Sequence, residues 1–221
     1  MSRPPLRIAV LISGRGSNMA AIARQCGAGL LNARLQAVIA DHPGAVGLDA
    51  ARALGIATQV VPWQGPPQRP AFEHALAVAL AATNPELIVL AGFMRILSPQ
   101  FVAARAGRIL NIHPSLLPKY TGLHTHRRVL EAGDRVHGAS VHFVTEELDG
   151  GPLVLQSRIA VSPADTEESL SARVQATEHI IYPRVIGWLA DGRLAWRQDR
   201  PWLDGRRLDA PLVEDFSADH T

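Results

Sequence analysis

The sequence predicts an α/β fold that is Rossmann-like, with a mostly parallel sheet, helices on both faces and an antiparallel C-terminal extension. In the first half, short apolar runs alternate with Ala-rich helical patterns, which is typical of parallel βαβ units with right-handed crossovers. After residue 120, two apolar runs follow one another across the turn Asp149-Gly150-Gly151-Pro152, which indicates antiparallel strands. A single domain over residues 1–202 and a polar tail over 203–221 are expected, since α/β domains routinely reach this size.

Local patterns predict the individual elements. Apolar runs of strand length predict strands over residues 6–12, 35–40, 58–61, 87–91, 108–112, 138–145 and 153–161. Helical patterns predict helices over residues 18–30, 45–54, 70–83, 125–131 and from 166 to about 188. Pro114 ends regular pairing after His113, because a proline biases the residue before it toward extended geometry. Thr166 is the expected N-cap of the last helix, with Glu167 and Glu168 placed favourably in its first turn.

Charge and hydropathy exclude several classes of protein. The 221 residues include 22 Lys or Arg and 20 Asp or Glu, a formal net charge of +2, which is far from the concentrated basic footprint of a nucleic-acid-binding domain. The longest apolar stretch, residues 87–94, is too short to span a bilayer. The single cysteine, Cys26, has no partner for an intrachain disulfide, so a reducing cytoplasm is the expected location. Neither nucleic acid nor membrane is expected among the partners.

Lysine is almost absent from this chain. Lys119 stands alone among 21 arginines, and a coding bias toward Arg is the plain interpretation, since charge alone does not distinguish the two on a solvated surface. Composition alone leaves a functional role for Lys119 open.

A glycine-rich turn, Ser13-Gly14-Arg15-Gly16-Ser17-Asn18, closes the first strand and opens the first helix. Unpaired backbone N–H groups at such a helix start favour a phosphate. A dinucleotide fingerprint needs a small residue where Met19 stands, so NAD binding is disfavoured and a mononucleotide phosphate stays possible. The alternative is a tight turn in which Ser17 or Asn18 only caps the helix.

Asn111 and His113 stand at the carboxyl end of a predicted strand, where open α/β sheets place their ligands. Two residues apart in extended chain, their side chains share one face. An amide beside an imidazole can supply two hydrogen-bond donors to the oxyanion of an acyl transfer. A purely structural Asn/His pair is the alternative.

An acidic turn, Thr145-Glu146-Glu147-Leu148-Asp149-Gly150-Gly151, lies between the two late strands. One of its carboxylates could fold back to raise the basicity of His113 and accept a proton. Spacing does not select which one, although Asp149, next to the glycines, is best placed. The alternative is a solvated hairpin.

Two other kinds of site are not expected. Five of the nine histidines lie between residues 113 and 142, and His124 and His126 are two apart, but no spacing matches the helical zinc signatures, so no metal is predicted. Ser17 is flanked by Arg15 and Met19 where a nucleophile elbow needs glycines, which argues against an α/β-hydrolase serine.

These motifs together resemble one family over nearly the whole chain, the glycinamide ribonucleotide formyltransferases of purine synthesis, which use 10-formyltetrahydrofolate. The resemblance is carried by the motifs at residues 10–18, 90–99, 110–120, 122–126, 137–145, 148–152, 172–175 and 178–179. The motif at 110–120, Leu-Asn-Ile-His-Pro-Ser-Leu-Leu-Pro-Lys-Tyr, is the most specific to folate-dependent formyl transfer.

The resemblance implies residue roles. Asn111, His113 and Asp149 would be catalytic, and His124 would support the loop near them. The residues implied to bind glycinamide ribonucleotide are Gly16, Ser17, Asn18, Gln175, Ala176, Thr177 and Glu178. The residues implied to line the folate slot are Arg69, Met94, Arg95, Ile96, Leu97, Asn111, Thr145, Glu146, Glu147, Leu148 and Asp149. Because direct amine attack needs no Schiff base, Lys119 would position a loop or line the ligand's rim.

The chain departs from the family pattern at three places: Thr121 stands where proline is usual, Asp41-His42-Pro43 replaces a Ser-Asn-Lys-like turn, and Ala176-Thr177 differs from some members. The closest alternatives are a formyltetrahydrofolate hydrolase and the enzyme that formylates initiator methionyl-tRNA. The first is expected to carry an extra segment before the first strand, and the second a further domain after residue 200. A non-catalytic nucleotide-binding module and a dehydrogenase are more distant alternatives. A homodimer is possible, and the sequence does not decide it.

Overall fold

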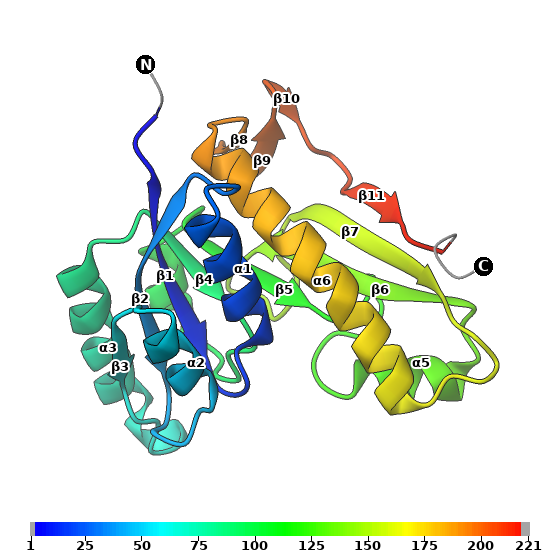
Figure 1. Ribbon diagram of the computed structural model, residues 1–221, viewed down its shortest axis with the longest axis horizontal. Helices are drawn as coiled ribbons and strands as arrows, with labels where there is room; N and C mark the ends of the chain where they lie inside the picture. The colour runs from blue at the N-terminus through cyan, green and yellow to red at the C-terminus, as the bar shows by residue number, and fades with distance from the viewer. Residues whose placement is uncertain (1–2, 218–221) are drawn as a thin grey trace.

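The computed structural model describes residues 3–217 and is organised around an eight-stranded sheet of order β11-β7-β6-β5-β4-β1-β2-β3 (Figure 1). Its strands are β1 (Leu6–Ile12), β2 (Ala33–Ala40), β3 (Thr58–Val60), β4 (Leu87–Leu90), β5 (Ile109–His113), β6 (Val136–Phe143), β7 (Leu153–Ala160) and β11 (Leu212–Asp215). Strands β1 to β5 are mutually parallel, whereas β6 runs antiparallel to both β5 and β7. The expected parallel sheet with an antiparallel extension is confirmed.

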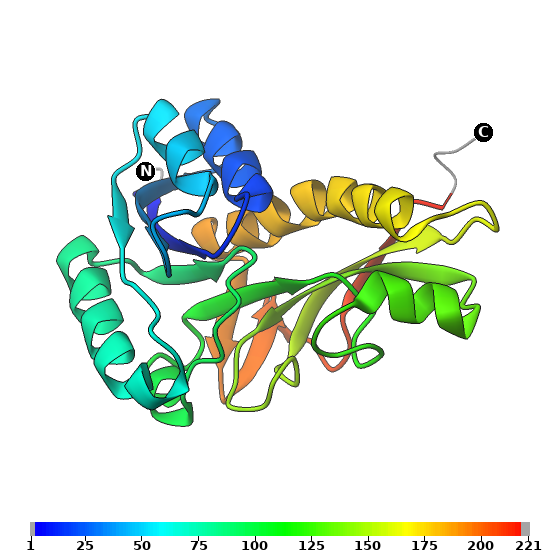
Figure 2. The same cartoon turned by 90° about the horizontal axis from the view of Figure 1, so that it is seen from below.

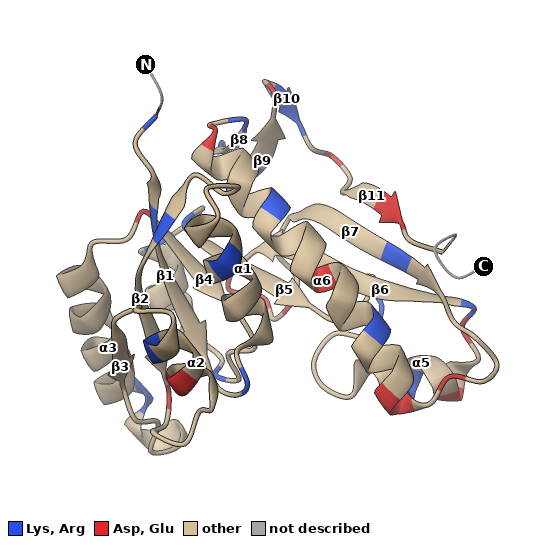
Figure 3. Ribbon diagram, in the orientation of Figure 1, with Lys and Arg blue, Asp and Glu red and all other residues tan. Residues whose placement is uncertain are grey.

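Helices cover both faces of this sheet, as the sequence predicts (Figure 2). The helices are α1 (Ser17–Gly27), α2 (Gly47–Ala53), α3 (Arg69–Thr83), α4 (Pro99–Ala103), α5 (Thr125–Ala132) and α6 (Glu167–Ala190), with a 3₁₀ turn at Pro66–Gln68. Alternate residues of β1 enter two different cores, since Ile8, Val10 and Ile12 pack with α1, α2 and α6, and Ala9 and Leu11 pack with α3 and α4. Charged residues are interspersed along the described chain (Figure 3).

The order of the strands fixes where a ligand can bind. From β1 the chain proceeds outward through β2 and β3 and then returns to β4 on the other side of β1. The connections therefore diverge at the carboxyl ends of β1 and β4, the topological switch point where open α/β sheets form a crevice.

Local end signals explain the boundaries. Helix α6 begins with Thr166, whose side chain accepts from the Ser169 N–H while Ser169 binds back to the Thr166 N–H, so the expected N-cap is confirmed. Strand β5 ends at His113, as Pro114 requires. Helix α1 is not capped by a side chain of Ser17 or Asn18, because its N-cap is Gly16 in the left-handed conformation (φ 69°). A Cβ at Gly16 would also lie 3.0 Å from the Gly47 Cα.

The structure contains several short elements that the sequence analysis does not predict. Helix α4 begins with Ser98 as N-cap and Pro99 as first residue, a start signal that the sequence does carry. Strands β8 (Leu194–Arg197), β9 (Arg200–Leu203) and β10 (Arg206–Arg207) form a separate antiparallel sheet. Strand β11, within the expected polar tail, pairs parallel to β7. The division into a domain over 1–202 and a tail over 203–221 stays a prediction. Among the described residues, no helix has the length and apolarity to cross a bilayer.

We predict that Tyr182→Phe destabilises the fold. Tyr182 on α6 is fully buried, and its hydroxyl lies 2.9 Å from the Leu90 carbonyl oxygen and 3.0 Å from that of Leu110, so it joins α6 to β4 and β5. Removing a buried hydrogen bond costs about 1–2 kcal/mol of unfolding free energy, measured by urea unfolding. Thr83→Val, which removes a hydroxyl at the partly exposed end of α3, should cost at most about 0.5 kcal/mol. Equal losses in the two variants would contradict the prediction.

Candidate active site

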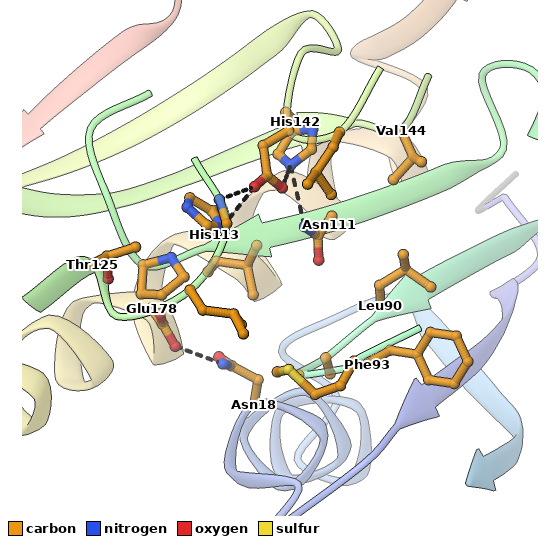
Figure 4. A pocket seen from close by; sticks show the side chains of 18 of the residues that line it. Asn18, Leu90, Phe93, Asn111, His113, Thr125, His142, Val144 and Glu178 are labelled. Atoms are coloured by element: carbon orange, nitrogen blue, oxygen red, sulfur yellow. Dashed lines mark hydrogen bonds and ion pairs between the residues drawn. The ribbon is translucent and has the colours of Figure 1, made fainter. Parts of the chain in front are cut away.

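A cavity of about 660 Å³ opens at the carboxyl ends of β1, β4 and β5 (Figure 4). Its walls come from the turn after β1, the segment after β4, the end of β5, the loop before α5, the acidic turn after β6 and one face of α6. The cavity therefore brings together three motifs that are far apart in sequence: the glycine-rich turn, the acidic turn and the Asn/His pair.

Asn111 and His113 both reach this cavity from β5, and Asp149 joins them from the acidic turn. The His113 Nδ1 lies 3.5 Å from the Asp149 Oδ2, and both side chains are more than nine-tenths buried. Asp149 also accepts a hydrogen bond from the Gly122 N–H at 2.9 Å. Of the three acidic residues that spacing left open, Asp149 is the one that the structure places beside His113, whereas Glu146 and Glu147 are exposed.

The backbone fixes the proton on one nitrogen of His113. Its Nε2 lies 2.9 Å from the Tyr120 carbonyl oxygen, which can only accept, so Nε2 carries a hydrogen. The Nδ1 faces the Asp149 carboxylate, which is also an acceptor. The Nδ1 is 3.5 Å from this carboxylate and makes no short hydrogen bond to it, so an N–H at this position can donate to a developing oxyanion.

His142 has the opposite protonation. Its Nδ1 lies 3.0 Å from the Phe143 carbonyl oxygen and donates to it, and burial lowers its pKa, so the ring is neutral and Nε2 is an acceptor. The Asn111 amide donates one N–H to this Nε2 at 3.2 Å, which leaves its second N–H for a ligand. Because His142 is neutral, its 3.9 Å approach to Asp149 is not an ion pair.

The sequence gives His142 no role of its own, although it is one of the five histidines between residues 113 and 142 and lies in the family motif at 137–145. It becomes visible as a site residue once β5 and β6 are known to be antiparallel, because Asn111 and His142 are directly paired in the register.

The nucleotide-binding residues expected from the resemblance divide into two groups. Gly16, Ser17, Asn18, Gln175 and Glu178 line the cavity. Ala176 and Thr177 do not, and Thr177 instead binds the Ser157 hydroxyl at 2.7 Å against β7. The difference follows from helix geometry, since residues 175 and 178 share a face of α6 that residues 176 and 177 do not.

Asn18 and Glu178 form the polar end of the cavity (Figure 4). The Asn18 Nδ2 donates to the Glu178 Oε2 at 2.7 Å, and the Asn18 Oδ1 is buried without a protein partner. Burial raises the pKa of Glu178 to about 7, although the bond from Asn18 lowers it. An orphaned acceptor beside a carboxyl group is suited to a ligand hydroxyl, which donates to one and bonds with the other.

The other end of the cavity has apolar side chains in its wall, among them Leu90, Phe93 and Val144 (Figure 4). Met94, Arg95, Ile96, Leu97 and the acidic turn from Thr145 to Asp149 line it, as the resemblance implies for the folate slot. Met94 and Ile96 are more than half exposed at its mouth. Arg69 is not part of the lining, because it starts α3, where its Nε is buried without a partner.

Asp41 and His42, in the turn that departs from the family pattern, form hydrogen bonds with two segments of the cavity wall. The Arg95 Nε donates to the fully buried Asp41, and the His42 Nε2 donates to the Ser13 carbonyl oxygen at 2.8 Å. The Met94 N–H in turn donates to the Ser13 hydroxyl at 2.9 Å. The turn after β1 is therefore tied to the segment after β4.

His124 and His126, at the start of α5, have different surroundings. His124 lines the cavity and precedes α5 with a left-handed backbone (φ 57°). His126 lies 3.0 Å from His137, whose pKa is lowered to about 4 by burial and by the neighbouring His126. Within residues 3–217, no group of three metal-binding side chains comes together.

Comparisons with known proteins agree on one family. The formyl transferase family profile matches residues 6–186. The chain is 52% identical to the phosphoribosylglycinamide formyltransferase of Escherichia coli over 92% of this chain and 96% of that one. The solved structure of the Coxiella burnetii phosphoribosylglycinamide formyltransferase has a TM-score of 0.90 at 48% identity and covers 95% of this chain and 99% of that one. A formyltetrahydrofolate deformylase from Burkholderia mallei has a TM-score of 0.82 at 25% identity, over 90% of this chain and 70% of that one.

We predict that Glu178→Gln stabilises the fold, and that this stabilisation is larger at higher pH. In the folded chain Glu178 ionises near pH 7 instead of at its ordinary 4.5, so the unfolded state releases this proton first and stability is lost as the pH rises from about 4.5 to 7. Glutamine does not titrate. The gain in unfolding free energy on substitution should therefore grow by about 2–3 kcal/mol between pH 5 and pH 8, measured by urea unfolding.

The matched control is Glu146→Gln, a substitution at an exposed carboxylate of the acidic turn. Its effect on unfolding free energy should differ little between the two pH values. A Glu178→Gln effect that is equally independent of pH would show that burial does not hold this proton.

Proposed function

Because the chain belongs to the formyl transferase family, among the phosphoribosylglycinamide formyltransferases, we propose that it transfers the formyl group of 10-formyltetrahydrofolate to the amine of glycinamide ribonucleotide in purine biosynthesis. The observation that carries the proposal is the meeting of Asn111, His113 and Asp149 between a polar and a more apolar end of one cavity. The polar end, with its helix N-terminus and the Asn18–Glu178 pair, suits the ribonucleotide, and the apolar end suits the folate. A location in the cytoplasm is part of the proposal.

In this mechanism the substrate amine attacks the formyl carbon directly. A C–N bond forms, the carbonyl oxygen takes up negative charge, and Asn111 and protonated His113 donate hydrogen bonds to it. Neutral His142 accepts the other N–H of the Asn111 amide and so orients the free N–H toward the oxyanion. Collapse of the tetrahedral intermediate breaks the bond to N10 of the folate, so the formyl group leaves one nitrogen for the other.

Asp149 has two roles in the proposal. Its carboxylate faces the His113 Nδ1 and favours the imidazolium. It also takes the proton that the attacking amine loses and returns it, through water, to the folate nitrogen as that nitrogen leaves. The proton lost by the amine therefore reaches the leaving nitrogen by way of Asp149, and the proposed step uses neither a metal nor a covalent enzyme intermediate.

The decisive experiment mixes the purified chain with glycinamide ribonucleotide and 10-formyltetrahydrofolate and follows the deformylated folate by absorbance. Release that requires the ribonucleotide is expected. Release without it would favour hydrolysis, the second candidate, which the likeness to the deformylase structure supports. No release from folded protein in either mixture would contradict both.

We predict that His113→Ala removes turnover and spares binding. The loss of an oxyanion donor and of the partner of Asp149 should lower kcat by about 10²–10⁴-fold. The dissociation constant of the ribonucleotide, measured by calorimetry, should change by less than about threefold, since His113 acts on the transition state. A comparable loss of binding, with native circular dichroism, would assign His113 to ground-state binding instead.

A further inference from the structure

The loop after β5 touches both members of the His113–Asp149 pair through its backbone. The Tyr120 carbonyl oxygen accepts from the His113 Nε2 at 2.9 Å, and two residues later the Gly122 N–H donates to the Asp149 Oδ2 at 2.9 Å. A shift of this loop by a fraction of an ångström would therefore change both hydrogen bonds at once. Residues 120–122 are therefore joined by hydrogen bonds to both members of the pair.

Residues 121 and 123 of this loop are exposed, so packing contributes little to holding them in place. Thr121 is exposed and Leu123 is 67% exposed. Tyr120 and His124 have left-handed backbones, with φ of 56° and 57°. Residues with a Cβ rarely adopt that conformation unless other contacts maintain it. Thr121 also lacks the restriction on φ that a proline would impose.

Arg128 supplies those contacts from α5. Its Nη1 donates to the Thr121 carbonyl oxygen at 2.6 Å and lies 3.4 Å from that of Leu123, so one guanidinium nitrogen bridges the two residues on either side of Gly122. The same guanidinium lies 5.1 Å from the centre of the Tyr120 ring. Arg128 therefore contacts Tyr120, the residue between Tyr120 and Gly122, and the residue after Gly122.

The other end of the loop is held separately. The Tyr120 hydroxyl and the Lys119 Nζ both donate to the Asp134 carboxylate, at 2.9 and 2.8 Å. These bonds fix the ring of Tyr120, but they do not reach Thr121, Gly122 or Leu123. Apart from the bond between Gly122 and Asp149, the hydrogen bonds to Thr121, Gly122 and Leu123 within residues 3–217 come from Arg128.

We propose that Arg128 is a positioning residue for formyl transfer, which holds the backbone of residues 120–123 so that the Tyr120 carbonyl and the Gly122 N–H orient His113 and Asp149. The inference rests on the proposed function. Arg128 itself does not line the cavity, and no hydrogen bond joins it to Asn111, His113 or Asp149. Its effect is expected on turnover rather than on substrate binding.

The test substitutes Arg128 with Met, which keeps the aliphatic stem and removes the donors. Arg127→Met is the matched control, because Arg127 is the next residue on α5 and pairs with Glu167 at 3.1 Å instead of with the loop. The Arg128→Met variant should lose about ten- to a hundredfold in kcat, since small misplacements of catalytic groups cost up to about 10²-fold. The KM for both substrates should stay within about twofold, and Arg127→Met should match the unaltered chain.

Arg128→Lys gives the rescue measurement. An ammonium group can donate to the Thr121 carbonyl oxygen but lacks the planar guanidinium that spans the loop, so kcat should return only part of the way. If Arg128→Met does not fold at the assay temperature, the comparison is made between Arg128→Lys and Arg127→Lys. An unchanged kcat for the Arg128 variant in either comparison would overturn the proposal.

A readout independent of activity separates this inference from the proposed function. Nitrogen-15 NMR of the His113 imidazole reports whether Nε2 is protonated and bonded to the Tyr120 carbonyl. Its resonances should shift in Arg128→Met and not in Arg127→Met. An inactive unaltered chain would refute the proposed function alone, whereas identical His113 resonances in the two Met variants would refute the role of Arg128.

Discussion

The antiparallel register of β6 against β5 is the constraint on which the site depends. It pairs Asn111 with His142 and His113 with Ser140. The first pair orients the amide. In the second, the buried Ser140 hydroxyl donates to the Ser115 carbonyl oxygen at 2.6 Å and accepts from the Leu117 N–H at 3.1 Å. One register therefore positions the Asn111 amide directly and also anchors the loop that returns Tyr120 to His113. A one-residue slip would turn both side chains to the opposite face.

The same pair of strands delivers Asp149. After β6 the chain turns back into β7, and Gly151 lies so close to the Phe143 carbonyl that a Cβ there would be 1.8 Å from the oxygen. Only glycine permits this close return, and Asp149 precedes it with a left-handed backbone (φ 53°). Two imidazoles and one carboxylate are thus brought together, yet His142 is neutral and His113 faces two acceptors. Each ring binds a backbone carbonyl through one nitrogen, and the two differ at the other nitrogen, which faces the Asp149 carboxylate in His113 and the Asn111 amide in His142.

The sequence predicts the large elements because they carry strong local signals. Long apolar runs and the Thr166 cap identify β1, β4 and α6 without reference to the rest of the chain. Strands β8 to β11 escape prediction because they are two to four residues long and gain their order from partners, as Trp196 does by packing on Phe143. The proposed catalytic set could be inferred from strand ends and from a family resemblance. The supporting residues His142 and Arg128 could not, since their roles depend on a register and on a loop path that no local pattern encodes.

The lone lysine illustrates how the surroundings decide chemistry. Lys119 is 63% exposed, and the hydrogen bond to Asp134 raises its pKa, so it remains an ammonium ion. A nucleophilic lysine needs the reverse, a desolvated amine with a lowered pKa. Its role is therefore to hold Asp134 and, with it, the ring of Tyr120, as a loop-positioning residue. Arginine could make the same exposed contact, which agrees with a compositional origin for its rarity. An ammonium ion at Lys119 agrees with the proposed attack by the substrate's own amine.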